Sequence, residues 1–160
     1  MVISVPCPQR NSTVLYRTVS WSRTVRLAGS SQENALKLAS VRLVTDDLPA
    51  LTAFYSTLTE TEPVTPYGSG DYAELHTEGG IIALADSAAV KRFNNNAAEA
   101  AANRSAIIEF EVDDVDAERA RLDDQVADWV QEPTNQPWGN RSMLLRDPDG
   151  NLINLYSTGH

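Results

Sequence analysis

The chain has 160 residues, of which 42% are hydrophobic, a formal net charge of −9 and a single cysteine. This length suits one domain or two small fused halves, and the apolar content is sufficient for a buried core. One cysteine excludes a disulfide framework and a cysteine-based zinc site within one chain. No apolar run approaches the length of about 18 residues that a transmembrane helix needs. The acidic balance disfavours nucleic acid and anionic membranes, so we expect neither as a partner.

Basic residues are concentrated in the first 37 positions. This segment holds five basic residues and one acidic residue, a net charge of +4, which leaves −13 for the remaining 123 residues. It is rich in Ser and Thr and has no clean helical or strand period. We interpret it as a basic N-terminal extension, and three origins stay open: a targeting segment, a solvated or mistakenly translated upstream stretch, and an arm that packs on a partner subunit. Cys7 lies here and is expected to be an incidental thiol.

Residues 38–86 predict a strand, a helix and three short strands. Positions 38–45 alternate and are rich in β-branched side chains, which is typical of a strand. Asp47 can cap the following helix, and Pro49 suits the first turn, where a missing N–H costs nothing. Apolar residues then recur at helical spacing as far as residue 59. The three short strands are predicted at 61–67, where two prolines suit an edge position, at 72–76 and at 81–85.

The same order of elements returns after an Ala- and Asn-rich stretch, 86–104, which we predict to be a short helix and a loop. The second set comprises a strand at 106–112, a helix at 115–124, and strands at 128–132, 138–146 and 151–157. DPDG (147–150) predicts a tight turn. VTDDL (44–48) parallels VDDVD (112–116), and EGGIIALA (78–85) parallels DGNLINLY (149–156). The sequence therefore contains two βαβββ modules, at about 38–86 and 105–158.

Three segments carry a resemblance to a known superfamily. They are LRDPDGNLINLY (145–156), PWGN (137–140), and the strand–DDL–helix pattern with AFY (53–55). Through them, residues 38–158 resemble the vicinal oxygen chelate superfamily, which includes glyoxalase I, extradiol dioxygenases, fosfomycin-resistance enzymes and bleomycin-resistance proteins. The resemblance implies an α+β fold in which two βαβββ modules form a curled mixed sheet around a concave pocket, with helices on the convex face. It also implies a homodimer.

Two-residue periodicity assigns the strand side chains to the two faces of each sheet. The side chains expected to meet the helices or enter the core are Val41, Leu43, Thr45, Ile82, Leu84, Ile108, Phe110, Val112, Ile153 and Leu155. Those expected to face the pocket are Ser40, Arg42, Val44, Ala83, Ile107, Glu109, Glu111, Leu152, Asn154 and Tyr156.

Metal-dependent members of the superfamily carry His, Gln or Glu at one position on the first and the last strand of each module. The corresponding residues in this chain are Ser40, Ala83, Ile107 and Asn154. Isoleucine and alanine side chains cannot ligate, and such a site needs imidazole or carboxylate groups. Of the two histidines, His160 is terminal, and His76 is expected to be satisfied or solvent-facing. We therefore predict no metal ion and no other cofactor.

The resemblance then implies the metal-free branch, of which the bleomycin-resistance proteins are the familiar example and which holds a ligand without altering it. We predict a protein that sequesters a small organic molecule, cationic or aromatic, since the acidic balance suits a cation. The candidate ligand-binding residues are Arg42, Glu109, Glu111, Trp138, Asn154 and Tyr156. Two of them have a second interpretation: Arg42 and Glu109 form a buried ion pair if the first strands of the two modules lie side by side. Trp138 could equally anchor the core.

Other function classes stay open. The main alternative is a metal-dependent lyase, isomerase or dioxygenase of the same superfamily, and a third is a structural or regulatory domain. Whether the chain is an enzyme is not determined by the residues. A secretory signal is disfavoured because no apolar stretch of about 7–15 residues follows a basic start, and we expect a cytoplasmic protein.

Overall fold

The computed structural model describes residues 36–159, and Lys37–His160 form one compact unit of the chain. The predictions for the basic extension and for Cys7 therefore lie almost wholly outside the described residues. Within the described part of the chain, none of the helices has the length and apolar character that crossing a membrane requires.

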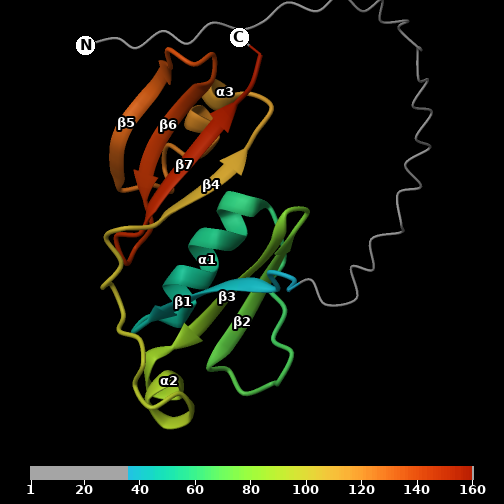
Figure 1. Ribbon diagram of the computed structural model, residues 1–160, viewed down its shortest axis with the longest axis vertical. Helices are drawn as coiled ribbons and strands as arrows, with labels where there is room; N and C mark the ends of the chain where they lie inside the picture. The colour runs from blue at the N-terminus through green and yellow to red at the C-terminus, as the bar shows by residue number, and fades with distance from the viewer. Residues whose placement is uncertain (1–35, 160) are drawn as a thin grey trace, which may run out of the picture. The chain divides into compact units, whose positions relative to one another are not determined.

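Ten elements follow one another along the chain, as Figure 1 shows. The first half contains β1 (Ser40–Thr45), α1 (Leu48–Thr59), β2 (Tyr72–Thr77), β3 (Gly80–Asp86) and α2 (Ser87–Phe93). The second half contains β4 (Ile107–Glu111), α3 (Val115–Arg121), β5 (Asp128–Asn135), β6 (Arg141–Arg146) and β7 (Leu152–Ser157).

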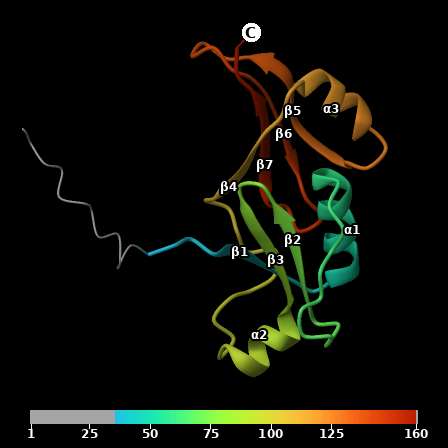
Figure 2. The ribbon, with the colours of Figure 1, turned by 90° about the vertical axis from the view of Figure 1, so that its right-hand side faces the viewer.

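The strands form two mixed sheets, one in each half of the unit. Their orders are β1-β3-β2 and β4-β7-β6-β5, and in both the first strand pairs in parallel with the last strand of its module. The register places Val41 opposite Ile82 and Ile108 opposite Ile153, which matches the internal repeat. Helices α1 and α3 lie on the same side of the sheets (Figure 2). The predicted α+β class, with mixed sheets and helices on one side, is confirmed.

The curl that the resemblance implied is not present in either sheet. The face turned away from α1 and α3 is consequently open, and we refer to it below as the open face (Figure 2).

The helices begin where the capping aspartates predict. The Asp47 side chain accepts a hydrogen bond from the backbone N–H of Ala50 at 3.0 Å, and a proline occupies the first turn of α1. Asp114 caps α3 in the same way, through the N–H groups of Asp116 and Ala117. Helix α3 ends at Arg121, earlier than the predicted residue 124, because the chain turns at Leu122 and buries its side chain.

The predicted strand at 61–67 is wrong. Only Val64 forms a β-bridge, with Glu74, and the rest of the segment is irregular. Pro63 and Pro66 flank Val64 and have no N–H to donate to a ladder, so the pairing cannot extend. The first module therefore has three sheet strands and the second has four.

Strand alternation places the core as expected, with one exception. Leu43 and Thr45 are buried, and so are the core-facing residues of β3 and β7, while Ile108 and Phe110 are partly buried and pack against the core. Val41 was expected to meet α1, but it remains 47% exposed. Helix α1 starts only three residues after β1 ends, and it covers the last part of that strand rather than its beginning.

A buried hydrogen bond joins the two modules. The hydroxyl of Tyr55 on α1 donates to Oδ2 of Asp147, in the turn after β6, at 3.0 Å. Tyr55 is fully buried, and Asp147 is 5% exposed. Burial, followed by the negative charge of Asp147, raises the pKa of the Tyr55 hydroxyl, so it remains a donor at neutral pH. Within the DPDG turn and the residue that follows it, the Asp147 carboxylate also accepts from the N–H of Asp149 and from the N–H and side-chain amide of Asn151.

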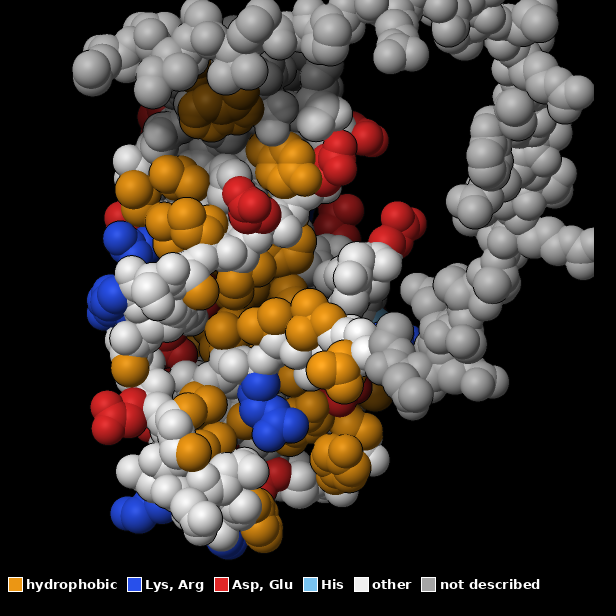
Figure 3. All heavy atoms as spheres, viewed as in Figure 1, with side chains coloured by type: hydrophobic (Ala, Val, Ile, Leu, Met, Phe, Trp, Pro, Cys, Tyr) orange, Lys and Arg blue, Asp and Glu red, His pale blue; other side chains and the backbone are white. Residues whose placement is uncertain are grey.

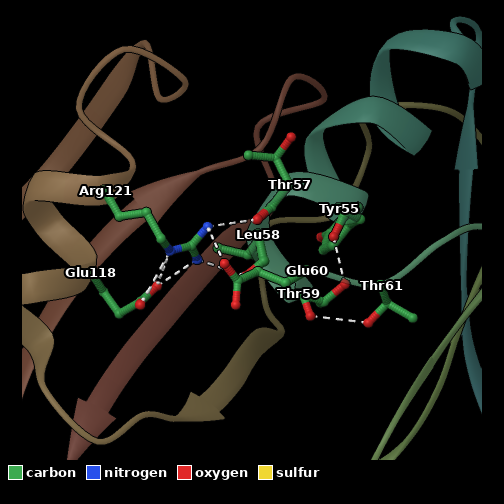
Figure 4. A network of polar contacts seen from close by, with 8 residues as sticks. All are labelled: Tyr55, Thr57, Leu58, Thr59, Glu60, Thr61, Glu118 and Arg121. Atoms are coloured by element: carbon green, nitrogen blue, oxygen red, sulfur yellow. Dashed lines mark hydrogen bonds and ion pairs between the residues drawn. The ribbon is translucent and has the colours of Figure 1, made fainter.

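A second connection joins the modules at the C-terminus of α1 (Figure 4). Arg121 on α3 donates to the carbonyl oxygens of Thr57 and Leu58, at 2.8 and 3.0 Å. These carbonyls belong to the last turn of α1, where helical partners are missing and a cation is favourable. Glu118 holds the same guanidinium from the other side, so α3 fixes the end of α1.

The Tyr55→Phe substitution should lower the free energy of unfolding by about 1–3 kcal/mol, because it leaves a buried carboxylate oxygen with one donor fewer. Urea unfolding of the full chain measures the change. Tyr67→Phe is the matched control, since Tyr67 is 77% exposed and loses a hydroxyl that water can replace. Equal stability of the Tyr55→Phe variant and the original chain would show that the contact does not hold the modules together.

Candidate functional site

The open face of the first module carries a connected set of polar side chains. The Tyr72 hydroxyl donates to Oε1 of Glu74 at 2.8 Å, and His76 Nε2 lies 2.8 Å from Glu74 Oε2. Arg42 lies over the Tyr72 ring, with its guanidinium carbon 5.3 Å from the ring centre. The hydrogen bonds from Tyr72 and His76 lower the pKa of Glu74, which stays ionised. His76 is half-exposed and has a carboxylate partner, which accounts for its position without a ligand.

The open face of the second module carries four of the predicted site residues. Glu109 and Asn154 are cross-strand partners, and the Asn154 amide donates to Glu109 Oε1 at 2.8 Å. The next pair on the same face of the sheet is Glu111 and Tyr156, two residues along the ladder. The Asn154 Oδ1 atom is buried and has no hydrogen-bond partner among the described residues. The strand register therefore brings Glu109, Glu111, Asn154 and Tyr156 together.

Two predicted site residues lie elsewhere. Arg42 belongs to the other sheet, and Trp138 lies in the turn between β5 and β6, where it is 72% exposed. That exposure excludes the interpretation of Trp138 as a core anchor. The buried ion pair of Arg42 and Glu109 is also wrong: both residues are exposed, and β1 and β4 are in separate sheets that share no strand pairing.

A groove of about 690 Å³ lies between the two sheets. We call it the intersheet groove, and it is lined by residues 38–41, 77–82 and 108–111. Its apolar lining includes Val41, Ile81 and Phe110, and Figure 3 shows hydrophobic side chains gathered across the middle of this face of the molecule. Its charged lining consists of Glu78, Glu109 and Glu111, with no basic residue among the described lining residues. The size is that of a site for a small organic ligand.

A second hollow, of about 470 Å³, lies beside α2. We call it the aromatic hollow, and its lining includes Tyr67, Tyr72, Phe93, Arg42 and Arg92. Arg42 was among the predicted site residues, whereas Phe93 and Arg92 were not, because the stretch 86–104 was interpreted only as a connection between the two modules. The one feature of the sequence that could have indicated Phe93 as a site residue is that it is the only aromatic residue in that stretch.

The positions at which the superfamily places metal ligands do not suit a metal ion in this chain. Ala83 and Ile107 carry no donor atom, and Asn154 donates to Glu109. Throughout residues 36–159, no group of three or more His, Cys, Asp or Glu side chains is arranged to hold a metal ion. Glu74 and His76 form the one described pair of His with a carboxylate.

A comparison with protein-family models matches residues 37–155 to the Glyoxalase/Bleomycin resistance protein/Dioxygenase superfamily. The chain belongs to this superfamily. The resemblance drawn from the sequence motifs is thereby confirmed. No curated protein matches the chain.

Solved structures of the superfamily share the fold. A glyoxalase/bleomycin resistance protein/dioxygenase from Nocardioides is 22% identical, with a TM-score of 0.64 over 77% of this chain and 83% of that one. A family enzyme from Burkholderia phytofirmans PsJN is 19% identical, with a TM-score of 0.68 over 78% and 100%. A glyoxalase-related enzyme from Fulvimarina pelagi is 18% identical, with a TM-score of 0.66 over 76% and 88%. At these identities the similarity shows the fold alone.

Aspartate side chains cluster in and around the turn after β6, and their negative charges affect the stability of the fold. Burial raises the pKa of Asp149, a hydrogen bond from Thr45 partly opposes the shift, and the charges of Asp147, Asp46 and Asp47 add to it. One carboxylate oxygen of Asp149 is buried and has no hydrogen-bond partner in the part of the chain that the structure describes. The folded chain thus binds a proton at Asp149 more readily than the unfolded chain, so this group makes the protein less stable as pH rises through that raised pKa.

The Asp149→Asn variant should be more stable than the original chain at pH 7, because it removes the buried charge. The gain should shrink as pH falls through the raised pKa and vanish below about 3.9, the ordinary value for Asp. Urea unfolding at a series of pH values measures it. Glu99→Gln removes one exposed charge and serves as the control. A stability difference that does not vary with pH would contradict this explanation.

Proposed function

We propose that this member of the superfamily binds a small organic cation in the intersheet groove and sequesters it without a metal ion. The observation that carries the proposal is the lining of the groove, which combines apolar walls with three carboxylates and no basic residue among the described lining residues. Apolar walls remove water from a ligand, and carboxylates attract a positive charge most strongly where water is excluded.

The residues of the second module have distinct parts in this proposal. The hydrogen bond from Asn154 holds the Glu109 side chain in place, so Glu109 can meet a cation without first losing much side-chain freedom. Glu111 adds a second negative charge two residues along the ladder, and Tyr156 lies opposite it. Trp138 and Arg42 do not line the intersheet groove, so in this proposal neither contacts the cation.

Binding without chemistry fits these groups better than catalysis does. The groove supplies charge and apolar contact, and among residues 36–159 neither Glu109 nor Glu111 has a histidine or lysine partner that would complete an acid–base pair.

We also propose a homodimer. Val41 and Ile107 are exposed apolar residues on the edge strands β1 and β4, where a second copy would cover them, and sedimentation velocity on the full chain tests this.

2-Naphthyltrimethylammonium should bind the full chain more tightly than the neutral 2-naphthamide in isothermal titration calorimetry. Glu109→Gln should weaken binding of the cation by about tenfold, since a charged contact is replaced by a neutral one. Glu99→Gln, which removes a charge outside the groove, should leave it unchanged. Equal affinity for the cation and the amide, or an unaltered affinity in Glu109→Gln, would exclude this site.

A metal-dependent lyase, isomerase or dioxygenase is the second candidate. The observation in its favour is the His76–Glu74 pair on the open face, since these are the side-chain types that bind divalent ions. The purified full chain should contain no stoichiometric zinc, nickel, iron or manganese by elemental analysis. One equivalent of such a metal, lost in a His76→Ala variant, would overturn the metal-free proposal and favour this one.

A further inference from the structure

The aromatic hollow is built from three rings, two of which are largely exposed, and Arg92 lies over the ring of Phe93 with its guanidinium carbon 4.4 Å from the ring centre. Tyr67 and Phe93 are 77% and 70% exposed, which is unusual for side chains of this size. The Tyr67 and Tyr72 rings lie with their centres 5.6 Å apart at an angle of 48°. Helix α2 supplies Phe93, the strand β2 supplies Tyr72, and the loop before it supplies Tyr67. Elements far apart in sequence thus present aromatic surface to one space.

Small side chains leave room between these rings. Ala85 on β3 and Ala89 on α2 line the hollow, and Ala85 is almost fully buried beneath it. Alanine at both positions gives a low apolar floor, where larger side chains would fill the space. The resulting cavity of about 470 Å³ suits a flat bicyclic ring system.

The charges around the hollow differ in sign from those of the rest of the unit. Arg92 is paired with Asp71 at 2.9 Å, so these two charges offset each other. Arg42 forms no ion pair with any described residue and lies over the Tyr72 ring, where its positive charge acts on the Tyr72 hydroxyl and on the Glu74 carboxylate. Glu74 is hydrogen-bonded to Tyr72 and His76 and lies outside the lining of the hollow. The lining therefore has a net charge of +1, in a chain whose residues after position 37 carry −13.

We propose that the aromatic hollow binds a planar aromatic carboxylate. The ring of the ligand contacts Tyr67, Tyr72 and Phe93 above the alanine floor, and its carboxylate forms a charge-assisted contact with the guanidinium of Arg42, which has no ion-pair partner among the described residues. This site goes beyond the proposed function, because it lies beside α2 rather than between the two sheets and selects the opposite charge. The intersheet groove shares none of its lining residues.

Isothermal titration calorimetry with 2-naphthoate and 2-naphthamide on the full chain tests the proposal, because the two ligands share a ring and differ in charge. We expect 2-naphthoate to bind about tenfold more tightly than the amide. Arg42→Gln should abolish this preference and leave amide binding unchanged. Phe93→Ala should weaken both ligands alike, by about tenfold, since it removes a shared ring contact.

Lys91→Gln is the matched control. It removes one positive charge from the same helix as Phe93, at an exposed position that does not line the hollow, and it should keep the preference for 2-naphthoate. Equal affinity for the two ligands in the original chain, or a preference that survives Arg42→Gln, would overturn the proposal. Glu109→Gln should not alter 2-naphthoate binding, and a loss there would place the anion in the intersheet groove instead. These outcomes for 2-naphthoate do not depend on whether the titration with 2-naphthyltrimethylammonium supports the proposed function.

Discussion

The buried hydrogen bond between Tyr55 and Asp147 fixes how the two modules of this unit fit together. Tyr55 extends from α1 of the first module to the turn after β6 of the second, and that turn is rigid because the same carboxylate also closes it through Asp149 and Asn151. Both partners are inside the core, where a missing donor would be costly. Arg121 holds the other end of α1, so the helix is attached to the second module at two points.

This attachment places both long helices on one side of the sheets and leaves the other side open (Figure 2). The open side then has two separate hollows whose charged lining residues differ in sign. The intersheet groove is lined by three carboxylates, and the aromatic hollow by Arg42, which has no ion-pair partner among the described residues, and by the Arg92–Asp71 pair. Because the surroundings of the two places differ in sign, a single small molecule of one charge should not occupy both equally well.

The motif residues through which the chain resembles the superfamily stabilise the fold of this chain. Tyr55 belongs to the AFY segment, and Asp147, Asp149 and Asn151 belong to the DPDGN turn; all four take part in the junction of the modules or in the turn itself. At the positions where the resemblance implied metal ligands, Ala83 and Ile107 have no donor atom and Asn154 donates to Glu109. Membership of the superfamily therefore determines the scaffold, whereas function depends on the particular side chains that the scaffold carries.

Alternation and helix caps were sufficient to predict nearly all the elements, because strand faces and helix starts depend on neighbouring residues. Asp47 and Asp114 mark the starts of α1 and α3, and the buried residues of β7 follow a strict period of two, whereas four consecutive residues of β3, from Ile82 to Ala85, are buried. The predicted strand at 61–67 is wrong because its prolines interrupt the backbone hydrogen bonding between strands. The alternation of side chains, from which strands are predicted, does not reflect this loss. Only the tertiary structure could separate Arg42 from Glu109, since the distance between two sheets depends on how α1 packs and not on any local period. The same packing brings Phe93 from α2 beside Tyr67 and Tyr72, so the sequence determined the modules and the tertiary structure decided which of their side chains share a site.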